Sequence, residues 1–563
     1  MKKRVGILLV VFTLICMLIP RSNVNAEEFY PRGIKVPQPI GIEKENEVST
    51  YSSRNASYSE KELMKMLNDE IKEALLQGEK EVDIFNMNLD KDKYSYLGYM
   101  EDYCPYINHD KMHLSLLFSK DTNVYVSFSI VNDMTLDETK EYINEVDQKL
   151  KTYTDLIDDS MSDLTKIKII HDQIVLNGEY EYDNLENNKL TNGSYSSNQL
   201  LMKNTAVCQG YACLFEYFMH LYDIDCYLNV SVVMSYMWNI VQLNDNYYHV
   251  DCTWDDPVRD IIGRVNHNYL LVSDDEMKKG RGQSTETHHD WQSTLKCQDT
   301  QYDNYYWYGV ATQIIQDRNK EYYIKDGKIT ERENQNENTL YTINTKWKVY
   351  DQPGYSYTIN FSRIFKYNDS LFYNDDSHIN KYSLNDQSVS IFENIDTTDG
   401  DIYGMRSNKN KIQYQIQKSP NESEYYIRNT KSYTFTLPKH ELTLSIGDEY
   451  SFDIDDIELS SSNEEVVKVV DGKLVAISLG DAVITATKDG ITDQCNVTVN
   501  NIKYGDVNGD GDITISDAQM IISYIVGKTS FNDLQIKKAD VNFDNDVTIS
   551  DVQIIINRIV GNK

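Results

Sequence analysis

The chain has 563 residues and a formal net charge of −33 at neutral pH. One hydrophobic core cannot organise a chain of this length, and a prior of about 150 residues per domain predicts roughly three or four domains. Because so acidic a protein repels phosphate groups, the composition argues against nucleic acid and against anionic lipid surfaces as partners.

The N-terminus has the pattern of a secretory signal peptide. Lys2, Lys3 and Arg4 precede an apolar run over residues 5–20, and a small-x-small sequence, Val-Asn-Ala, ends at residue 26. The run is shorter than the roughly 20 apolar residues that a membrane span needs, which argues against a retained anchor. No later segment of the sequence is apolar enough to span a bilayer. We therefore assign the first 26 residues to a signal peptide and expect the mature protein outside the cell.

Cysteines are sparse for a protein held together by disulfides. Of the 8 cysteines, Cys16 lies within the signal peptide. Lipid attachment there is an alternative, although Ile15 stands where a lipid-attachment box needs a small residue. The mature chain keeps an odd number, so at least one thiol lacks a disulfide partner within the chain, and Cys208 is the candidate. The mature cysteines are Cys104, Cys208, Cys213, Cys226, Cys252, Cys297 and Cys495.

Residues 27–159 are interpreted as a polar leader followed by an α/β region. The leader extends to about residue 60 and shows no periodicity, whereas apolar residues beyond it recur at helical or alternating spacing. The elements predicted from this point are a helix over 60–76, strands within 114–131, a helix carrying Tyr142, Val146 and Leu150, and a helix over 161–177 capped by Ser162 or Asp163.

Cys208 lies near the start of the segment NTAVCQGYACLFEYFMHLY, residues 204–222. Apolar residues recur in this segment at three- and four-residue spacing and predict an amphipathic helix. Backbone N–H groups at a helix N-terminus favour an anion, so a thiol there can have a pKa below its ordinary value of about 8.5. The alternative is a structural cysteine, since cysteine is among the most often buried residue types.

The sequence SVVMSYMWNIVQLNDNYYHVDCTWDDP, which follows, predicts a β-hairpin that turns at Asn244 and Asp245. Its second strand presents His249 and Asp251 on one face, because side chains alternate along a strand. A cysteine at a helix N-terminus followed by such a hairpin is the arrangement of papain-like thiol chemistry. In that chemistry a base takes the thiol proton and a carboxylate orients the base.

The motifs KIKIIHDQIV, AVCQGYA, MWN, YYHVDCTWDDP and HNYLLVSDDEM, in this order, resemble the bacterial transglutaminase-like superfamily over about residues 160–300. The resemblance implies an α/β (α+β) papain-type core, with Cys208 as the nucleophile and Asp251 as the orienting acid. The histidine of the family falls at the place of Tyr236 in this chain. A phenol, with an ordinary pKa of about 10, cannot form the imidazolium that stabilises a thiolate.

Two interpretations of this domain remain open. In the first it is a pseudoenzyme, a degenerate and non-catalytic module that binds peptides or proteins. In the second it is an active thiol peptidase or acyl transferase on amide substrates, with His249 as a substitute base. The missing histidine favours the first interpretation, and retention of Cys208 and Asp251 keeps the second open. Further histidines that no pattern places near the thiol are His171, His267, His288 and His289.

Two all-β regions are predicted next. Residues 301–432 are rich in tyrosine, and RIFKYNDSLFYNDD predicts a hairpin that turns at Asn368 and Asp369. This region indicates no specific function. Residues 433–500 combine short strands with turns at sandwich-like intervals and resemble the bacterial Ig-like group 2 domain. That resemblance implies an Ig-like β-sandwich, which serves as a spacer or an adhesion module.

Two nearly identical twelve-residue loops follow, DVNGDGDITISD from Asp506 and DVNFDNDVTISD from Asp540. Each places oxygen donors at positions 1, 3, 5, 7, 9 and 12, which suits the six or more oxygens that Ca²⁺ takes. Position 6 needs a left-handed turn, which Gly511 and Asn545 supply. We predict two Ca²⁺ ions, one held by Asp506, Asn508, Asp510, Asp512, Thr514 and Asp517 and the other by Asp540, Asn542, Asp544, Asp546, Thr548 and Asp551.

A helical segment follows each loop, AQMIISYIVG after the first and VQIIINRIVG after the second, so that residues 503–563 resemble a type I dockerin. The resemblance implies calcium-dependent binding to a cohesin module of a cellulosome-type scaffold. It also implies that loop positions 10 and 11 help to choose the cohesin. Because both loops carry the same pair, either half is expected to dock, in two orientations related by a half-turn. The residues of these pairs are Ile515, Ser516, Ile549 and Ser550.

The sequence thus predicts a secreted multidomain protein with a cohesin and a peptide or protein as partners, and without a membrane span. Polysaccharide breakdown is its expected context, while the substrate and the particular cohesin stay open. The predicted parts are a signal peptide (1–26), a leader and α/β region (27–159), a transglutaminase-like domain (160–300), a tyrosine-rich all-β region (301–432), an Ig-like domain (433–500) and a small α-helical calcium-binding dockerin (503–563).

Overall fold

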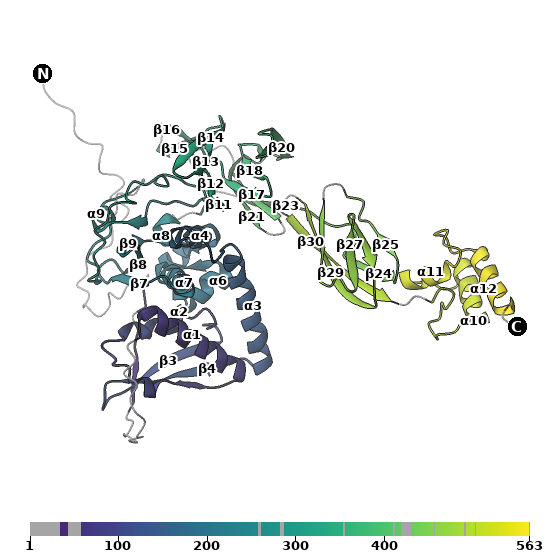
Figure 1. The fold of residues 1–563 in the computed structure, drawn as a ribbon, viewed down its shortest axis with the longest axis horizontal. Coiled ribbons are helices and arrows are strands. Elements are labelled where there is room, and N and C mark those ends of the chain that lie inside the picture. Colours follow the sequence, from purple (N-terminus) through teal and green to yellow (C-terminus); the bar gives the residue numbers. More distant parts are fainter. Residues whose placement is uncertain are drawn as a thin grey trace. The chain divides into compact units, whose positions relative to one another are not determined.

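The computed structural model describes residues 34–35, 37–42, 58–256, 260–281, 287–352, 355–408, 411–417, 429–454, 457–488, 491–500 and 503–561. The predicted signal peptide lies outside these residues. Among the helices that are described, none combines the length and the apolar character that crossing a membrane requires. The chain forms two compact units, the first holding most residues up to Lys366 and the second most residues from Thr397 onward (Figure 1).

The first unit begins with a four-stranded sheet and two long helices. The sheet has the order β1-β3-β4-β2, in which β1 joins β3 in parallel and the other neighbours are antiparallel. The predicted helix over 60–76 and the strands within 114–131 are confirmed. The elements are β1 (Ile40–Ile42), α1 (Glu60–Gln77), β2 (Glu81–Asp83), η1 (Phe85–Met87), η2 (Ser95–Tyr99), α2 (Met100–Tyr103), β3 (Met112–Ser119), β4 (Tyr125–Asn132) and α3 (Leu136–Thr154).

A second sheet of the same unit, with the order β10-β9-β8-β7, carries the predicted hairpin. Asn244 and Asp245 both have positive φ at the turn between β8 and β9, as a two-residue type I′ turn requires. Ser162 caps α4, as predicted. The elements are α4 (Asp163–Asn177), β5 (Glu179–Tyr180), α5 (Tyr182–Glu186), η3 (Gly193–Tyr195), α6 (Ser197–Lys203), β6 (Thr205–Ala206), α7 (Cys208–Leu221), β7 (Cys226–Ser231), β8 (Tyr236–Leu243), β9 (Asn246–Val250), α8 (Cys252–Asp255), β10 (Leu270–Val272) and α9 (Asp274–Met277).

Helix α7 is the centre of the first unit. It contacts α1, α2, α4, α6 and strand β8, and every residue from Cys208 to His220 is buried. Its apolar residues form one large core with those of α1, α3 and α4, in which Tyr153 stacks on Phe218 with ring centroids 4.8 Å apart. The amphipathic helix predicted from the sequence is therefore buried on all sides, because neighbours cover its polar face as well.

The tyrosine-rich region consists of small sheets, so the all-β prediction for it holds. The sheet orders are β11-β12-β13-β14, β15-β16, β17-β18-β19-β20 and β21-β22-β23. Asn368, with φ of 46°, lies in the predicted turn between β17 and β18. The strands are β11 (Ile315–Asp317), β12 (Lys320–Lys325), β13 (Lys328–Glu333), β14 (Asn336–Thr342), β15 (Trp347–Gln352), β16 (Tyr355–Ile359), β17 (Ile364–Tyr367), β18 (Ser370–Asn374), β19 (His378–Ser383), β20 (Val389–Asn394), β21 (Asp401–Asn408), β22 (Lys411–Gln417) and β23 (Asn429–Thr434).

The second unit contains two further sheets, with the orders β24-β30-β29-β26 and β25-β28-β27. Side chains from both sheets, among them Leu474, Ile484 and Cys495, share one core. This is the layout of a small β-sandwich, while its Ig-like identity stays a prediction. The strands are β24 (Glu441–Ser445), β25 (Glu449–Tyr450), β26 (Glu458–Ser461), β27 (Val467–Val470), β28 (Lys473–Ala476), β29 (Gly480–Lys488) and β30 (Ile491–Asn500).

Three helices end the chain, α10 (Ile515–Ile525), α11 (Asp533–Ala539) and α12 (Ile549–Gly561). They share a small core that includes Ile521 and Ile555. The helices predicted after the two acidic loops are α10 and α12, and the structure confirms both. Helix α11, which links them, was not predicted.

Candidate functional site

Cys208 is the first residue of α7 and is fully buried. Backbone amides of Met237 and Gln209 hydrogen-bond the thiol and favour the thiolate. Burial outweighs these amides, since it penalises the charged form, and raises the pKa of Cys208 to about 12. The low pKa that the helix N-terminus alone favours is therefore not found, and the group is a neutral thiol at pH 7.

Tyr236 begins β8 and lies in the packing cluster around Cys208. Its phenol donates a hydrogen bond to Asp251 Oδ1 over 3.1 Å. Burial, together with the charges of Asp251 and Cys208, raises the pKa of Tyr236 well above its ordinary value. The phenol is therefore neutral at physiological pH and holds its proton toward the carboxylate, which leaves it unable to accept the thiol proton.

Asp251 links Tyr236 and Cys208 to the start of helix α8. Its Oδ1 also accepts the backbone N–H groups of Thr253 and Trp254, both at 3.0 Å, and so caps α8. The structure brings Cys208, Tyr236 and Asp251 together, in that the charge of Asp251 acts on both neighbours. The carboxylate is thus present at the place predicted for the orienting acid, but it orients a phenol.

His249 belongs to a different contact network. Its Nδ1 accepts a hydrogen bond from Trp238 Nε1 at 3.0 Å, and its Nε2 lies 3.0 Å from Asp274 Oδ1. Because an indole nitrogen can only donate, Nδ1 is unprotonated and Nε2 carries the hydrogen. Burial lowers the pKa of His249, which keeps the ring neutral. Both nitrogens are engaged by residues other than Cys208, so the structure does not bring this predicted substitute base to the thiol.

His288 contacts the second carboxylate oxygen of Asp251. Its Nε2 lies 2.8 Å from Asp251 Oδ2, and the ring is fully buried. Trp254 and Trp238 pack on the ring at centroid distances of 4.0 and 4.9 Å. Within the described part of the chain, His288 Nδ1 has no hydrogen-bond partner. The sequence analysis could not place His288 in the site, because no sequence pattern relates it to an aspartate 37 positions earlier. The adjacent His289 is exposed and contacts Asp290.

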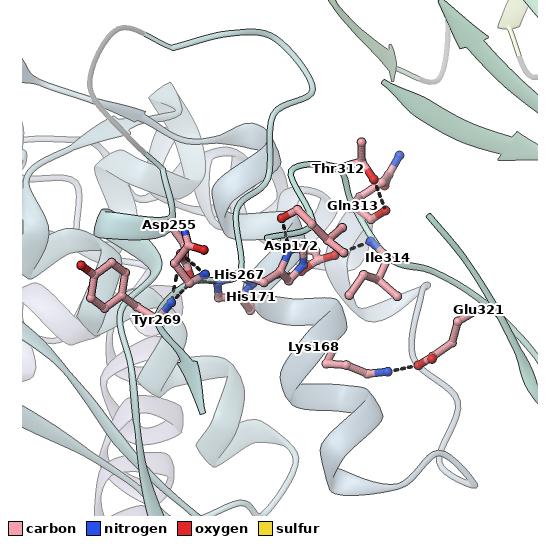
Figure 2. A network of polar contacts seen from close by, with 12 residues as sticks. Lys168, His171, Asp172, Asp255, His267, Tyr269, Thr312, Gln313, Ile314 and Glu321 are labelled. Atoms are coloured by element: carbon pink, nitrogen blue, oxygen red, sulfur yellow. Dashed lines mark hydrogen bonds and ion pairs between the residues drawn. The ribbon is translucent and has the colours of Figure 1, made fainter. Parts of the chain in front are cut away.

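A buried quartet of two histidines and two aspartates lies between α4, α8 and the segment around residue 267 (Figure 2). His171 contacts Asp172 at 2.9 Å and Asp255 at 3.1 Å, one through each ring nitrogen. His267 contacts Asp172 at 2.9 Å and the carbonyl of Val310 at 3.1 Å. Every ring nitrogen of the two histidines thus faces an oxygen atom of a carboxylate or of a backbone carbonyl.

The charges of this quartet compensate one another. Burial by itself would lower the pKa of His171, but the hydrogen bonds and charges of Asp172 and Asp255 raise it to about 9. Burial alone would raise the pKa of Asp172, but the charges and hydrogen bonds of His267 and His171 hold it below its ordinary range. Ligand atoms of His171, Asp172 and His267 lie within 4.8 Å of one another, which a metal site would also show. Hydrogen bonds already satisfy these atoms, so we assign the quartet a structural role.

Polar contacts continue from the quartet across the predicted domain boundary at residue 300. Asp172 Oδ2 accepts the backbone N–H of Ile314 at 2.6 Å, and Lys168 forms a buried ion pair with Glu321 (Figure 2). Helix α4 is thereby joined to the first strands of the tyrosine-rich region. The papain-type prediction did not include this support, because the two partners are more than a hundred residues apart in the sequence.

The first acidic loop is ordered by hydrogen bonds between its own side chains and amides. Asp517 is fully buried and accepts the amides of Asn508 and Thr514 at 3.0 and 2.8 Å. Asp506 accepts the amide of Gly509 at 3.0 Å. Gly511 has φ of 92°, as predicted for position 6. Carboxylates are thus gathered at alternate positions of a tight loop, which is the donor type that Ca²⁺ prefers.

The second loop repeats these contacts. Asp551 is fully buried and accepts the amides of Val541 and Thr548 at 2.9 and 2.8 Å. Asn545 has φ of 67°, and its backbone N–H donates a hydrogen bond to Asp540 Oδ2 at 3.0 Å. The left-handed turn predicted for this position is therefore confirmed in both loops. The residues at position 10 begin the following helices and stay open to solvent, with Ile515 54% and Ile549 65% exposed.

A family model for the dockerin type I domain matches residues 504–560. These residues form a dockerin type I domain. Dockerins of this type bind calcium and dock onto cohesin modules in the setting of cellulosomes, and they are typically extracellular. The oxygen donors and the repeated left-handed turns of the two loops fit that cation. No curated protein matches the chain.

Several solved structures share weak similarity with the chain. A GH10 xylanase with a bacterial Ig-like domain, from termite gut, is 22% identical over 12% of this chain and 20% of its own, with a TM-score of 0.11. A transglutaminase (TGase) is 13% identical over 30% of this chain and 48% of its own, at 0.16. A candidate cysteine protease from Cytophaga hutchinsonii is 12% identical over 26% of this chain and 67% of its own, with a TM-score of 0.16.

The chain therefore spans about a fifth of the xylanase and about half of the transglutaminase. TM-scores this low establish neither a common fold nor a common activity. The transglutaminase-like and Ig-like assignments accordingly remain predictions from the sequence motifs.

Proposed function

We propose that the protein is a secreted component of a cellulosome-type assembly, held on its scaffold by calcium-dependent binding of the dockerin to a cohesin. The observation that carries this proposal is the pair of loops in register, each followed by a helix that exposes an isoleucine in its first turn. Isothermal titration of the full chain with a cohesin tests it. Binding is expected in calcium and is expected to vanish in EGTA.

Each loop is proposed to hold one Ca²⁺ through its carboxylates, its asparagine and the carbonyl at position 7. The first ion would take Asp506, Asn508, Asp510, Asp512, Thr514 and Asp517, and the second would take Asp540, Asn542, Asp544, Asp546, Thr548 and Asp551. A bound ion neutralises the mutual repulsion of these acids and fixes the start of the helix that follows. Calcium would thereby set the positions of Ile515, Ser516, Ile549 and Ser550, the proposed cohesin contacts.

For the first unit we propose a non-catalytic peptide- or protein-binding module. Three features support this proposal: a neutral phenol at Tyr236, a raised pKa at Cys208, and the engagement of His249 by Trp238 and Asp274. Neither Tyr236 nor His249 is thereby placed to take the thiol proton, and a neutral Tyr236 offers no positive charge to stabilise the thiolate. Assays of the full chain on peptide and glutamine-like amide substrates are expected to give no turnover above that of Cys208→Ala.

An active thiol enzyme is the second candidate, and His288 is the observation that favours it. Its Nδ1 lacks a hydrogen-bond partner in the described chain while its Nε2 contacts Asp251, so an imidazole and a carboxylate are already paired beside the site. In this case His288→Asn would abolish amide turnover and raise the pH at which Cys208 is alkylated. Equal alkylation profiles for the parent and His288→Asn would eliminate this candidate.

A further inference from the structure

A short N-terminal segment lies directly on the Cys208 site. We call it the strap and define it as Ile34, Lys35 and residues 37–42. It precedes α1 in the sequence. Its first described residue packs with the start of α7, and its last residues pair with strand β3. These contacts were not expected, because the segment belongs to the part of the chain that was interpreted as a polar leader.

Ile34 packs in the apolar cluster that contains the thiol. It is 5% exposed and packs in one cluster with Cys208, Ala212 and Met237. Tyr236 packs against the same cluster. An aliphatic side chain from the strap thus contributes to the burial that keeps Cys208 inaccessible and raises its pKa.

Lys35 binds at the next position through both its backbone and its side chain. Its backbone N–H donates to Gln209 Oε1 at 2.5 Å, and Gln209 Nε2 donates to Asp102 Oδ2 at 2.9 Å. The Lys35 ammonium lies 3.0 Å from Glu101 and 3.8 Å from Asp102. Burial would lower the pKa of Lys35, but the two acids raise it. The two acids and the backbone contact together hold one basic residue of an extended segment through charge-assisted hydrogen bonds.

The rest of the strap is held by shape and by strand pairing. Pro37 lies so close to Gly98 that a Cβ at Gly98 would be 2.5 Å from the Pro37 Cβ. Residues Ile40–Ile42 then pair in parallel with β3, which would be an edge strand without them, and Ile40 lies opposite Leu117 and Ile42 opposite Ser119. Adding a strand to an exposed sheet edge is a general mode of peptide recognition, in which the main chain provides affinity and side-chain pockets provide specificity.

We propose that the face formed by Gly98, Glu101, Asp102, Cys208, Gln209 and Met237 is a peptide-binding site, and that the strap of the same chain occupies and closes it. The ligand that this face would take in place of the strap is an extended peptide with an aliphatic residue, a lysine directly after it and a proline two positions later. The inference deepens the proposed binding function of the first unit by naming its ligand class and its regulation.

The test measures access to Cys208 in the full-length, calcium-loaded chain. Alkylation by iodoacetamide is followed residue by residue with mass spectrometry in the parent and in the double variant Ile34→Asp/Lys35→Glu. The substitutions place a charge in the apolar cluster and a third acid beside Glu101 and Asp102. Alkylation of Cys208 is expected to accelerate at least about tenfold, while Cys495, in the second unit, reacts at its parent rate.

A second variant leaves the strap sequence intact. In Gly98→Ala the new Cβ would collide with Pro37, so faster alkylation of Cys208 is expected there as well. Lys61→Glu is the matched control, because it reverses a lysine of the same unit that pairs with Asp225 rather than with the site. The control is expected to alkylate at the parent rate.

The last part of the test measures whether a separate peptide binds to the site that the strap occupies. A fluorescein-labelled peptide with the sequence of residues 32–42 is expected to bind the double variant saturably and the parent not at all. The same peptide with glutamate in place of its lysine is expected not to bind. Unchanged Cys208 alkylation in both the double variant and Gly98→Ala, or absence of peptide binding to the double variant, overturns the proposal. These readouts do not involve amide turnover, so their failure is distinguishable from a failure of the non-catalytic assignment.

Discussion

Tyr236 donates its phenolic hydrogen to Asp251 Oδ1 at 3.1 Å, while His288 contacts the other oxygen of the same carboxylate at 2.8 Å. A carboxylate in a thiol enzyme serves to orient an imidazole toward the nucleophile. Here the residue that packs in the Cys208 cluster and contacts Asp251 is a phenol, and the imidazole lies on the other oxygen of the acid. The carboxylate therefore contacts a phenol and an imidazole at once, through a different oxygen for each.

Replacing Tyr236 by histidine is expected to activate Cys208. An imidazole at this position could pair with Asp251 and, when protonated, stabilise the thiolate, so the pKa of the thiol falls below its present value of about 12. We expect the rate of Cys208 alkylation at pH 7 to rise by roughly tenfold or more in Tyr236→His. The matched control is Tyr236→Phe, which removes the hydroxyl without adding a base. Equal rates for the two variants would show that the side chain at this position does not govern the thiol.

The His–Asp quartet makes the stability of the first unit depend on pH. The pKa of His171 is about 9 in the fold against an ordinary 6.5, so its contribution is complete below about pH 6.5 and is lost as the pH rises through 9. The pKa of Asp172 is lowered, so its contribution is present above its ordinary value of 3.8 and is lost as the pH falls through the folded value. Raising the pH from 6.5 to 10 is expected to cost about 3 kcal/mol through His171.

Tryptophan fluorescence isolates this effect, because all five tryptophans belong to the first unit: Trp238, Trp254, Trp291, Trp307 and Trp347. Urea unfolding at pH 6.5 and pH 10 gives the free energy of unfolding for the parent and for His171→Asn. The variant is expected to have a much smaller difference between the two pH values. His113→Asn, in which the replaced ring is largely exposed, is the control and should keep the parent difference. A parent difference no larger than that of His171→Asn would contradict the assignment.

Short-range patterns predicted much of this protein. The loops from Asp506 and Asp540, their left-handed residues, the hairpin turn at Asn244 and the cap at Ser162 all depend on residues within a dozen positions of one another. Their conformations follow from local sterics and local hydrogen bonds, and the residue types at neighbouring positions are enough to predict both.

The candidate site was predicted only in part, because its remaining contacts are long-range. His288 reaches Asp251 from 37 positions away, and Lys35 reaches Gln209 from 174 positions away. No periodicity encodes such distances. The raised pKa of Cys208 has the same origin, since helix position favours a thiolate while burial by distant segments opposes it.

Loss of calcium is expected to destabilise the dockerin without affecting the first unit. At a free calcium concentration one hundred times the dissociation constant, each site contributes about 2.7 kcal/mol to stability. EGTA should therefore lower the thermal transition of the second unit in calorimetry and leave the urea transition seen by tryptophan unchanged. A parallel loss in both transitions would mean that calcium acts outside the two loops.

The number of calcium sites is tested by removing one ligand from each loop. Titration calorimetry of the parent is expected to give two ions, whereas Asp510→Ala and Asp544→Ala should each give one. Glu464→Gln, an exposed acid outside the loops, is the control for loss of a single charge and should keep both sites. A parent stoichiometry of one would leave the second loop, which has Asn545 in place of a glycine, as a structural loop without an ion.

The repeated exposed pairs predict that the dockerin binds its cohesin in two equivalent ways. Ile515 and Ile549 are 54% and 65% exposed at matching places, and each is followed by a serine. Because either face suffices, Ile515→Asp/Ser516→Asp should weaken cohesin binding only about twofold, the statistical loss of one of two orientations. Ile549→Asp/Ser550→Asp should behave in the same way, whereas the quadruple variant should lose binding. A collapse of affinity in one double variant alone would instead assign docking to a single face, and the exposed isoleucine of the other half would then need a different partner.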